Sequence, residues 1–210
     1  MGISLSKGQG ISLSKANNGN ALSQVTMGLG WDAYVWKEEK TGGFLGGLFG
    51  GGSETGKRVK VERDVDLDAS CLVIDKSGRV IDTIYFGKLT GANGAIKHTG
   101  DNLTGDGDGD DEQIKVNLNS LSDDVKHVVF TVNAFSNVNF DIVHNAFCRL
   151  LDEKGNEIIR FPLDSSGDHT AIVMAKVTRN GNDWDFDAIG EKCNGKTVKA
   201  ITSVVQELLG

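Results

Sequence analysis

The sequence predicts an all-β-dominated fold, a two-sheet β-sandwich that carries a short C-terminal helix. Segments rich in Val, Ile and Phe recur through most of the 210 residues. Short strands at such spacing are typical of sandwiches and barrels. Turn-forming residues separate the segments, and Gly occurs 28 times whereas Pro occurs once. The apolar spacing of an amphipathic helix is found in the last segment of the chain.

Length and composition narrow the class of protein. A chain of 210 residues favours a single domain over residues 1–210. Its 39% hydrophobic and 24% charged residues are ordinary for a globular protein and exclude a disordered chain. The formal net charge is -7. Nucleic-acid binding needs a basic face, and the sequence offers no cluster of Lys and Arg, so we expect no nucleic-acid partner.

The N-terminus and the cysteines indicate the compartment. The first ten residues contain no apolar signal-peptide core, and no apolar run is long enough to span a bilayer. We therefore expect a cytoplasmic protein that does not itself span a membrane. Cys71, Cys148 and Cys193 share no short metal-ligand spacing, which predicts reduced thiols.

The first 36 residues predict strands. Residues 3–7 read ISLSK and recur as residues 11–15, and both copies alternate apolar and polar residues. The Gly-Gln-Gly link between the copies suits a hairpin. Residues 25–36 predict a further strand that is interrupted at Gly28 and Gly30.

Residues 38–58 predict a Gly-rich flexible insert in the domain. Seven Gly fall within residues 42–52, too many for a stable helix or strand. The insert carries apolar side chains that could dock on a partner or a membrane surface; the alternative is a plain hairpin tip. These side chains are Phe44, Leu45, Leu48 and Phe49. Residues 51–58 nearly match a phosphate loop, but Arg58 replaces the magnesium-binding hydroxyl residue.

Strands follow in quick succession from residue 59 onward. The predicted strands cover residues 59–74, 80–86, 113–118, 125–135, 140–151, 157–163, 171–178 and 184–189. Turn residues at 76–78, 153–156 and 179–182 predict three hairpins. The C-terminal helix is predicted from the spacing of Val198, Ile201, Val205 and Leu208.

An acidic strand face is the first candidate site. Asp64, Asp66 and Asp68 alternate with Val65 and Leu67. Because successive side chains of a strand point to opposite faces, the three carboxylates share one side, and the apolar residues face the core. Three carboxylates in a row repel one another unless a cation lies among them. Asp183, Asp185 and Asp187 alternate similarly without a Gly-rich loop, and we interpret them as a solvated face.

Residues 100–112 form the second acidic segment and favour a calcium site. Gly105, Gly107 and Gly109 let the backbone turn tightly, so that side chains and carbonyls can converge on one centre. Calcium prefers six to eight oxygen ligands of these kinds. Neither acidic segment fits the EF-hand pattern, and the four His are too scattered for zinc. The candidate metal ligands are Asp64, Asp66, Asp68, Asp101, Asn102, Asp106, Asp108, Asp110, Asp111 and Glu112.

The chain resembles the TerD family of tellurium-resistance and general-stress proteins. The resemblance rests on the motifs SLSKG at 4–8, LGWD at 29–32, DLDAS at 66–70, HTGDN at 98–102, TG at 104–105 and GDDE at 109–112. It implies a calcium-binding β-sandwich with two or more Ca²⁺ ions between the two acidic segments. It also implies partners in a stress-resistance complex, membrane-associated at the inner membrane in one interpretation, and no enzymatic activity. The insert at 38–58 departs from the compact members of the family.

The sequence therefore predicts a calcium-binding stress-response module that docks on partners. No catalytic residues are expected, because no Ser/His or Cys/His pair is suggested by spacing. One alternative is a metal-dependent hydrolase, in which a metal and paired carboxylates activate water. The other is a binder of cyclic nucleotides or similar small ligands, described for relatives of the family.

Overall fold

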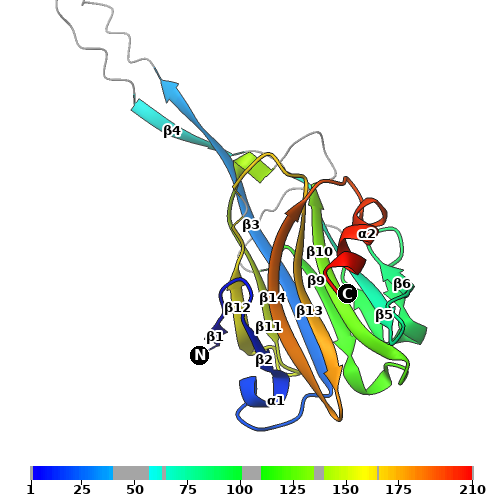
Figure 1. The fold of residues 1–210 in the computed structure, drawn as a ribbon. Coiled ribbons are helices and arrows are strands. Elements are labelled where there is room, and N and C mark those ends of the chain that lie inside the picture. The colour runs from blue at the N-terminus through cyan, green and yellow to red at the C-terminus, as the bar shows by residue number, and fades with distance from the viewer. Residues whose placement is uncertain are drawn as a thin grey trace, which may run out of the picture.

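The chain folds into two β-sheets packed face to face, as the computed structural model shows (Figure 1). The structure describes residues 2–39, 57–62, 65–100, 110–134, 140–164 and 166–209. The predicted fold class, an all-β-dominated sandwich with a short C-terminal helix, is confirmed.

The first sheet has eight strands within the described residues. Its order is β1 (Ile3–Ser4), β12 (Glu157–Pro162), β11 (Val143–Leu151), β3 (Gln24–Glu39), β9 (Glu112–Asn117), β8 (Ile96–His98) and β7 (Thr90–Gly91), while β4 (Lys57–Glu62) pairs with β3. The second sheet, of six described strands, has the order β2 (Gly10–Ser12), β14 (Asp183–Cys193), β13 (Ala171–Asn180), β10 (Val125–Ala134), β5 (Leu67–Asp75) and β6 (Val80–Ile84). Short helices are α1 (Leu13–Ala16), η2 (Ala92–Gly94), η3 (Leu118–Ser120), η4 (Phe140–Ile142), η5 (Val198–Ile201) and α2 (Thr202–Glu207).

The alternation of β5 explains how the core forms. Leu67, Ala69, Cys71 and Val73 point between the sheets and belong to the main apolar core. Leu72 and Ile74 point the other way and belong to a second cluster on the outer face of this sheet. A strand buried on both faces needs a cover on each side. The predicted direction of the apolar residues is confirmed, and the outer cover is the C-terminal helix.

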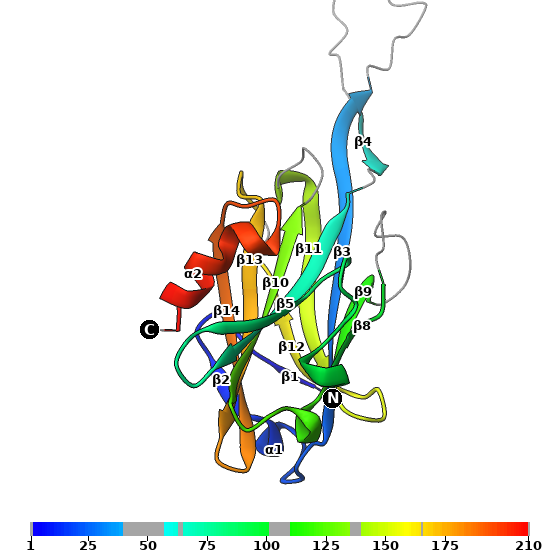
Figure 2. The same cartoon turned by 90° about the vertical axis from the view of Figure 1, so that its right-hand side faces the viewer.

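The C-terminal segment covers the outer face of the second sheet. Figures 1 and 2 both place α2 beside β10 and β13. Val198 and Val205 pack there against Leu72, Ile74 and Val129. The predicted helix is thus confirmed, but its first turn is the 3-10 helix η5. Leu208 was expected on the buried stripe and is 38% exposed, because the helix ends before that residue.

Replacing Val205 with alanine should lower the free energy of unfolding by about 2 kcal/mol. The side chain is fully buried, and each buried methyl or methylene group contributes about 0.8 kcal/mol before the cavity is counted. The neighbour Val204 is only partly buried and serves as the control, with an expected loss below about 1 kcal/mol. Urea denaturation of both variants measures the difference, and equal losses would contradict this packing.

Three hairpins form as predicted. Strand β5 pairs with β6, β11 with β12, and β13 with β14, each pair antiparallel. The predicted strand over 59–74 is wrong, because its two halves are β4 and β5, which lie in different sheets. The segment at 140–151 begins with the 3-10 helix η4 before β11.

The predicted N-terminal hairpin is also wrong. Strand β1 pairs in parallel with β12, whereas β2 pairs antiparallel with β14 in the other sheet. The second copy of the repeat enters helix α1, whose N-terminus is capped by the Ser12 side chain. Each copy buries its leucine, Leu5 and Leu13, in the core. The alternating pattern therefore predicted which residues reach the core, but not the strands with which β1 and β2 pair.

Strand β3 is longer than expected and passes through Gly28 and Gly30 without a break. Beyond the sandwich it pairs with β4, and the two strands form a ribbon that projects from the body (Figures 1 and 2). The outer residues of the predicted insert, 38–39 and 57–58, thus belong to strands. Residues 40–56, with the four apolar side chains named above, lie outside the described residues.

Two further expectations concern the cysteines, predicted to be reduced thiols, and the helices, none of which was expected to span a membrane. Cys71, Cys148 and Cys193 are free thiols. Burial raises the pKa of Cys148 to about 12, so this thiol stays protonated and unreactive. In the part of the chain that the structure describes, no helix combines the length and the apolar composition that a membrane crossing requires.

Candidate functional site

Half of the ten predicted metal ligands can be located. Asp66, Asp68, Asp110, Asp111 and Glu112 belong to the described residues. The remaining five, Asp64, Asp101, Asn102, Asp106 and Asp108, lie outside them. The geometry below therefore concerns the ends of the two acidic segments that lead into β5 and β9.

The two acidic segments meet at Glu112. Its Oε2 accepts a hydrogen bond of 2.6 Å from the backbone N–H of Ala69 on β5. Asp66 and Asp68 lie within three residues of Ala69, so this bond ties the first segment to the second across 43 positions of sequence. Both partners are buried, and a charged acceptor in such a site makes a stronger bond than a neutral one.

His98 completes this junction. Its Nε2 lies 3.0 Å from the Ala69 carbonyl oxygen and 3.5 Å from Glu112 Oε2. The backbone N–H of Gly100 donates to His98 Nδ1 over 3.1 Å. Because Nδ1 is an acceptor, the ring proton sits on Nε2, which donates towards Ala69 and Glu112. The structure thus buries His98 between the two segments.

Asp110 lies on the outer face of the first sheet. The Arg149 Nε donates to its Oδ1 over 2.7 Å, and Gln113 Nε2 donates to its Oδ2 over 3.0 Å. The Asp110 side chain is fully buried, and its carboxylate occupies the space where a Cβ on Gly28 would lie. Gly28 does not interrupt β3; its missing side chain leaves room for the carboxylate.

Asp111 is held by β3. Its backbone N–H donates to the Leu29 carbonyl over 2.8 Å, and its Oδ2 accepts from the Trp31 N–H over 2.9 Å. Burial raises the pKa of Asp111, with smaller contributions from the charges of Asp110, Asp32 and Glu112. Acidic groups that disfavour one another's ionisation in this way are stabilised by a nearby cation.

The described acids do not by themselves form a metal-binding cluster. Among the residues that the structure describes, no three His, Cys, Asp or Glu side chains converge as metal ligands would. Asp68 faces outward from the second sheet, opposite in direction to Asp110 on the first sheet. Their hard carboxylate oxygens are the donors that calcium prefers. The two carboxylates therefore do not converge on one point.

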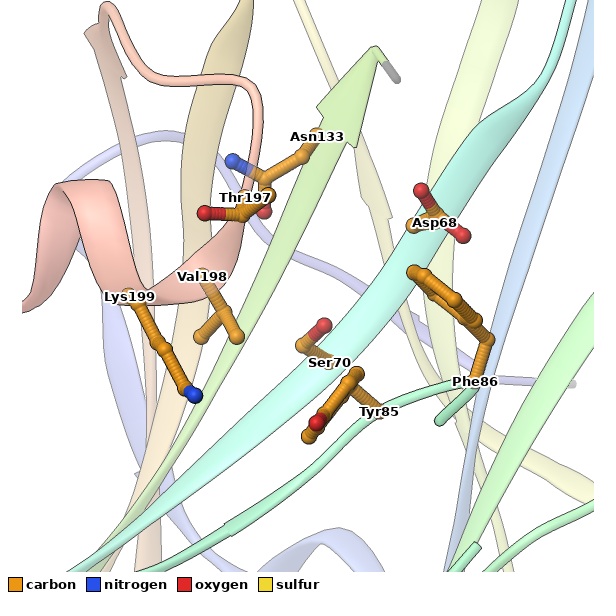
Figure 3. A pocket seen from close by; sticks show the side chains of 8 residues that line it. All are labelled: Asp68, Ser70, Tyr85, Phe86, Asn133, Thr197, Val198 and Lys199. Carbon is orange, nitrogen blue, oxygen red and sulfur yellow. The ribbon is translucent and has the colours of Figure 1, made fainter. Parts of the chain in front are cut away.

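Asp68 also lines a pocket of about 210 Å³ beneath the helix η5 (Figure 3). The pocket is lined by Asp68, Ser70, Tyr85, Phe86, Asn133, Thr197, Val198 and Lys199. Sequence reasoning missed this pocket apart from Asp68. A signal was present, since Ser70 and Asn133 are polar residues in largely apolar strands.

Arg149 is another residue that the sequence did not single out. It alternates with the core residues Cys148 and Leu150 of β11 and so faces outward. Besides Asp110 it contacts Glu157 over 3.3 Å, and Arg160 binds the same Glu157 over 2.8 Å. Asp183, Asp185 and Asp187 share one face of β14 as predicted, and Asp185 accepts from Asn180 over 2.8 Å.

The chain is similar in sequence to known proteins over most of its length. The TerD domain model matches residues 1–203. The chain is 47% identical over 196 residues to the tellurium resistance protein TerZ of Serratia marcescens, covering 93% of each chain. It is 38% identical over 212 residues to the stress response protein SCP2 of Bacillus subtilis (strain 168), covering 97% of this chain and 98% of the relative.

A solved structure shares the fold. The crystal structure of a homologue of telluride resistance protein (TerD) from Streptomyces coelicolor A3(2) superposes with a TM-score of 0.65 at 19% identity. The match covers 88% of this chain and 98% of that one. At this identity the likeness concerns the sandwich architecture.

Proposed function

This chain belongs to the TerD family, and from that premise we propose that it is a calcium-binding module of a stress response. In this proposal it binds two or more Ca²⁺ ions and docks on partners of a membrane-associated resistance complex in the cytoplasm. The observation that carries the proposal is the junction of the two acidic segments through Glu112, Ala69 and His98. The names of the relatives, tellurium resistance and stress response proteins, support the biological setting.

The acids would divide between the ions by position. Asp110 and Asp111 lie at the end of the segment 101–109, and Asp66 and Asp68 lie at the start of β5. The remaining candidates are Asp64, Asp101, Asn102, Asp106 and Asp108. Glu112 would hold β9 against β5 rather than act through a free carboxylate, because Ala69 already donates to it. Carboxylate and amide oxygens of this kind are hard donors, which favour calcium over zinc.

Docking would use the projecting ribbon of β3 and β4. Trp36 is 57% exposed on this ribbon. The Tyr34 ring stacks on His144 at 3.9 Å between centroids, and the Lys60 ammonium lies 4.4 Å from the Tyr34 centroid. An ordered aromatic and cationic surface of this kind is typical of binding sites on proteins. The ribbon leads into residues 40–56, whose apolar side chains would extend the same contact.

Calcium titration tests the cation part of the proposal. The wild-type chain should bind calcium, and Asp68→Ala and Asp110→Ala should each weaken or remove one ion. Because the two carboxylates face opposite sides of the sandwich, the double variant should show the sum of both losses. Asp185→Ala is the control and should bind as the wild type does. Calorimetry measures all five proteins; unchanged binding in both single variants would contradict the assignment of these ligands.

A second experiment tests docking on the ribbon. Trp36→Ala should lower calcium-dependent capture of partners from a lysate at least tenfold, because a central aromatic side chain contributes about 2 kcal/mol or more to such contacts. Ile81→Ala, a change at an exposed residue of β6, is the matched control and should leave capture unchanged. Deletion of residues 42–52 should act in the same direction as Trp36→Ala. Equal capture by all variants would contradict the proposal that partners contact the ribbon.

The metal-dependent hydrolase is the second candidate. It would be favoured if the purified protein hydrolysed phosphoesters with calcium and the Asp110→Ala variant did not. A metal near Asp110 and Asp111 would then polarise the substrate and activate water. The binding module is preferred because the relatives are named for resistance and stress response rather than for a reaction.

A further inference from the structure

We propose that the pocket beneath η5 binds a small zwitterionic ligand, with an ammonium group at one end and an anionic group at the other. The pocket is built by the polar end of β5 and β10, by Tyr85 and Phe86 after β6, and by η5. This inference goes beyond the calcium proposal but shares Asp68 with it, so calcium and the ligand's ammonium group would compete for that carboxylate. Asn133 and Lys199, which carry much of the argument, belong to neither acidic segment.

The floor of the pocket is polar although it is buried. Along β5, the outward residues Leu72 and Ile74 lie under the C-terminal helix, and the outward residues Asp68 and Ser70 continue the row beyond it. Asp68 is 5% exposed and Ser70 is 2% exposed. A sheet face covered only for packing would continue with apolar side chains, because buried polar groups cost free energy unless they are paired. The outward side chains of β5 therefore change from apolar to polar at the place where the pocket lies.

Asn133 gives this floor a buried polar atom that has no hydrogen-bond partner in the described structure. It lies opposite Asp68 in the register of β5 and β10 and is 1% exposed. Its Nδ2 donates to the Gly195 carbonyl over 2.7 Å, which fixes the orientation of the amide. Its Oδ1 is buried and has no hydrogen-bond partner in the described structure. A buried acceptor left unpaired costs free energy, and a ligand N–H that donates to it would recover that cost.

Opposite charges lie at the two ends of the pocket. Figure 3 shows Asp68 near one end and the Lys199 ammonium near the other, with Val198, Ser70 and Tyr85 between them. Within the described part of the chain, the Lys199 side chain makes no ion pair or hydrogen bond. A ligand with a single charge would meet a like charge at one end. A zwitterion meets an opposite charge at both ends.

The walls between the charged ends are apolar. The rings of Tyr85 and Phe86 pack edge to face, with centroids 5.5 Å apart, and Val198 lies across from Tyr85 (Figure 3). These walls suit a short hydrocarbon body, and an aromatic face also stabilises an adjacent ammonium group. A volume of about 210 Å³ is below the range of about 300–1,000 Å³ for drug-sized ligands. The ligand class is therefore a small amino acid or a related amino-carboxylate.

A ligand panel tests the class directly. The probes are the twenty standard amino acids together with 4-aminobutyrate, 6-aminohexanoate and 8-aminooctanoate. Hexylamine and hexanoate provide the ammonium and the carboxylate alone. Calorimetry with the full chain in EGTA, where no calcium competes for Asp68, should find a zwitterion that binds at least tenfold more tightly than both single-charge compounds. The proposal is overturned if no zwitterion binds, or if hexylamine or hexanoate binds as tightly as the best zwitterion.

Variants locate the binding. Lys199→Met should weaken the best zwitterion at least tenfold and leave hexylamine affinity unchanged, because it removes only the cationic end. Asp68→Asn should weaken the zwitterion and hexylamine alike. Lys115→Met changes an exposed lysine of β9 in the other sheet and is the matched control. If Lys199→Met binds the zwitterion as the wild type does, the proposal is wrong.

Calcium titration of Lys199→Met separates this inference from the proposed function. The variant should bind calcium as tightly as the wild type, since Lys199 is not among the candidate ligands. Failure of calcium binding in the wild type, with zwitterion binding intact, would reject the proposed function and leave the pocket assignment standing. Calcium binding without any zwitterion binding would reject the pocket assignment alone.

Discussion

Replacing Glu112 with alanine is expected to lower the free energy of unfolding by about 2–4 kcal/mol. The substitution leaves the buried N–H of Ala69 without its acceptor, which costs about 1–3 kcal/mol, and it removes a buried methylene worth about 0.8 kcal/mol. The Nε2 proton of His98 also loses a neighbouring acceptor at 3.5 Å. Urea denaturation followed by circular dichroism measures the loss.

Glu112→Gln is the matched control for this effect. The amide oxygen of glutamine can still accept from the Ala69 N–H, so this variant should lose less than half as much stability. Both variants should be compared in EGTA, so that any calcium effect is absent from the measurement. An alanine variant as stable as the wild type would mean that Glu112 does not hold the two segments together. Equal losses in both variants would mean that the hydrogen bond is not the cause.

The elements that the sequence predicted correctly depend on local information. Turn residues at 76–78, 153–156 and 179–182 close hairpins whose strands are neighbours in sequence. The alternation in β5 likewise gave the direction of its apolar residues, because the period of two is a property of one strand. Local patterns of this kind need no knowledge of the rest of the chain.

The misassigned elements depend on distant partners. The two copies of the N-terminal repeat look alike, yet β1 adds to β12 and β2 adds to β14 in the opposite sheet. Nothing within residues 3–15 distinguishes the two edges on which they pair. The division of residues 59–74 between two sheets is a second case, because β4 follows the projecting end of β3.

The candidate site shows the same limit. Spacing alone grouped Asp66 with Asp68 and Asp110 with Asp111. It could not show that Arg149, which is 39 positions from Asp110, lies against that carboxylate. Even less of the pocket could be predicted from the sequence, because its walls come from β5, β10, η5 and the residues after β6. Such sites become visible only when the sheet register is known.

Calcium should stabilise the native fold strongly against thermal unfolding. At a free concentration one hundred times the dissociation constant, each ion adds about 2.7 kcal/mol. For a chain of this length that corresponds to a rise of about 5–10 °C in Tm per ion. Thermal unfolding in excess calcium and in EGTA measures the rise. Identical midpoints in the two buffers would contradict calcium binding to the native state.

The variant Arg149→Met should enlarge this calcium effect. Without calcium, the fully buried Asp110 carboxylate loses its cationic partner at 2.7 Å, so the variant should melt well below the wild type in EGTA. With calcium, the ion takes over the role of the guanidinium, and much of the difference should disappear. Arg160→Met is the control, because Arg160 binds Glu157 on the same face without contacting Asp110. A calcium-induced rise in Arg149→Met no larger than in Arg160→Met would mean that Asp110 is not a calcium ligand.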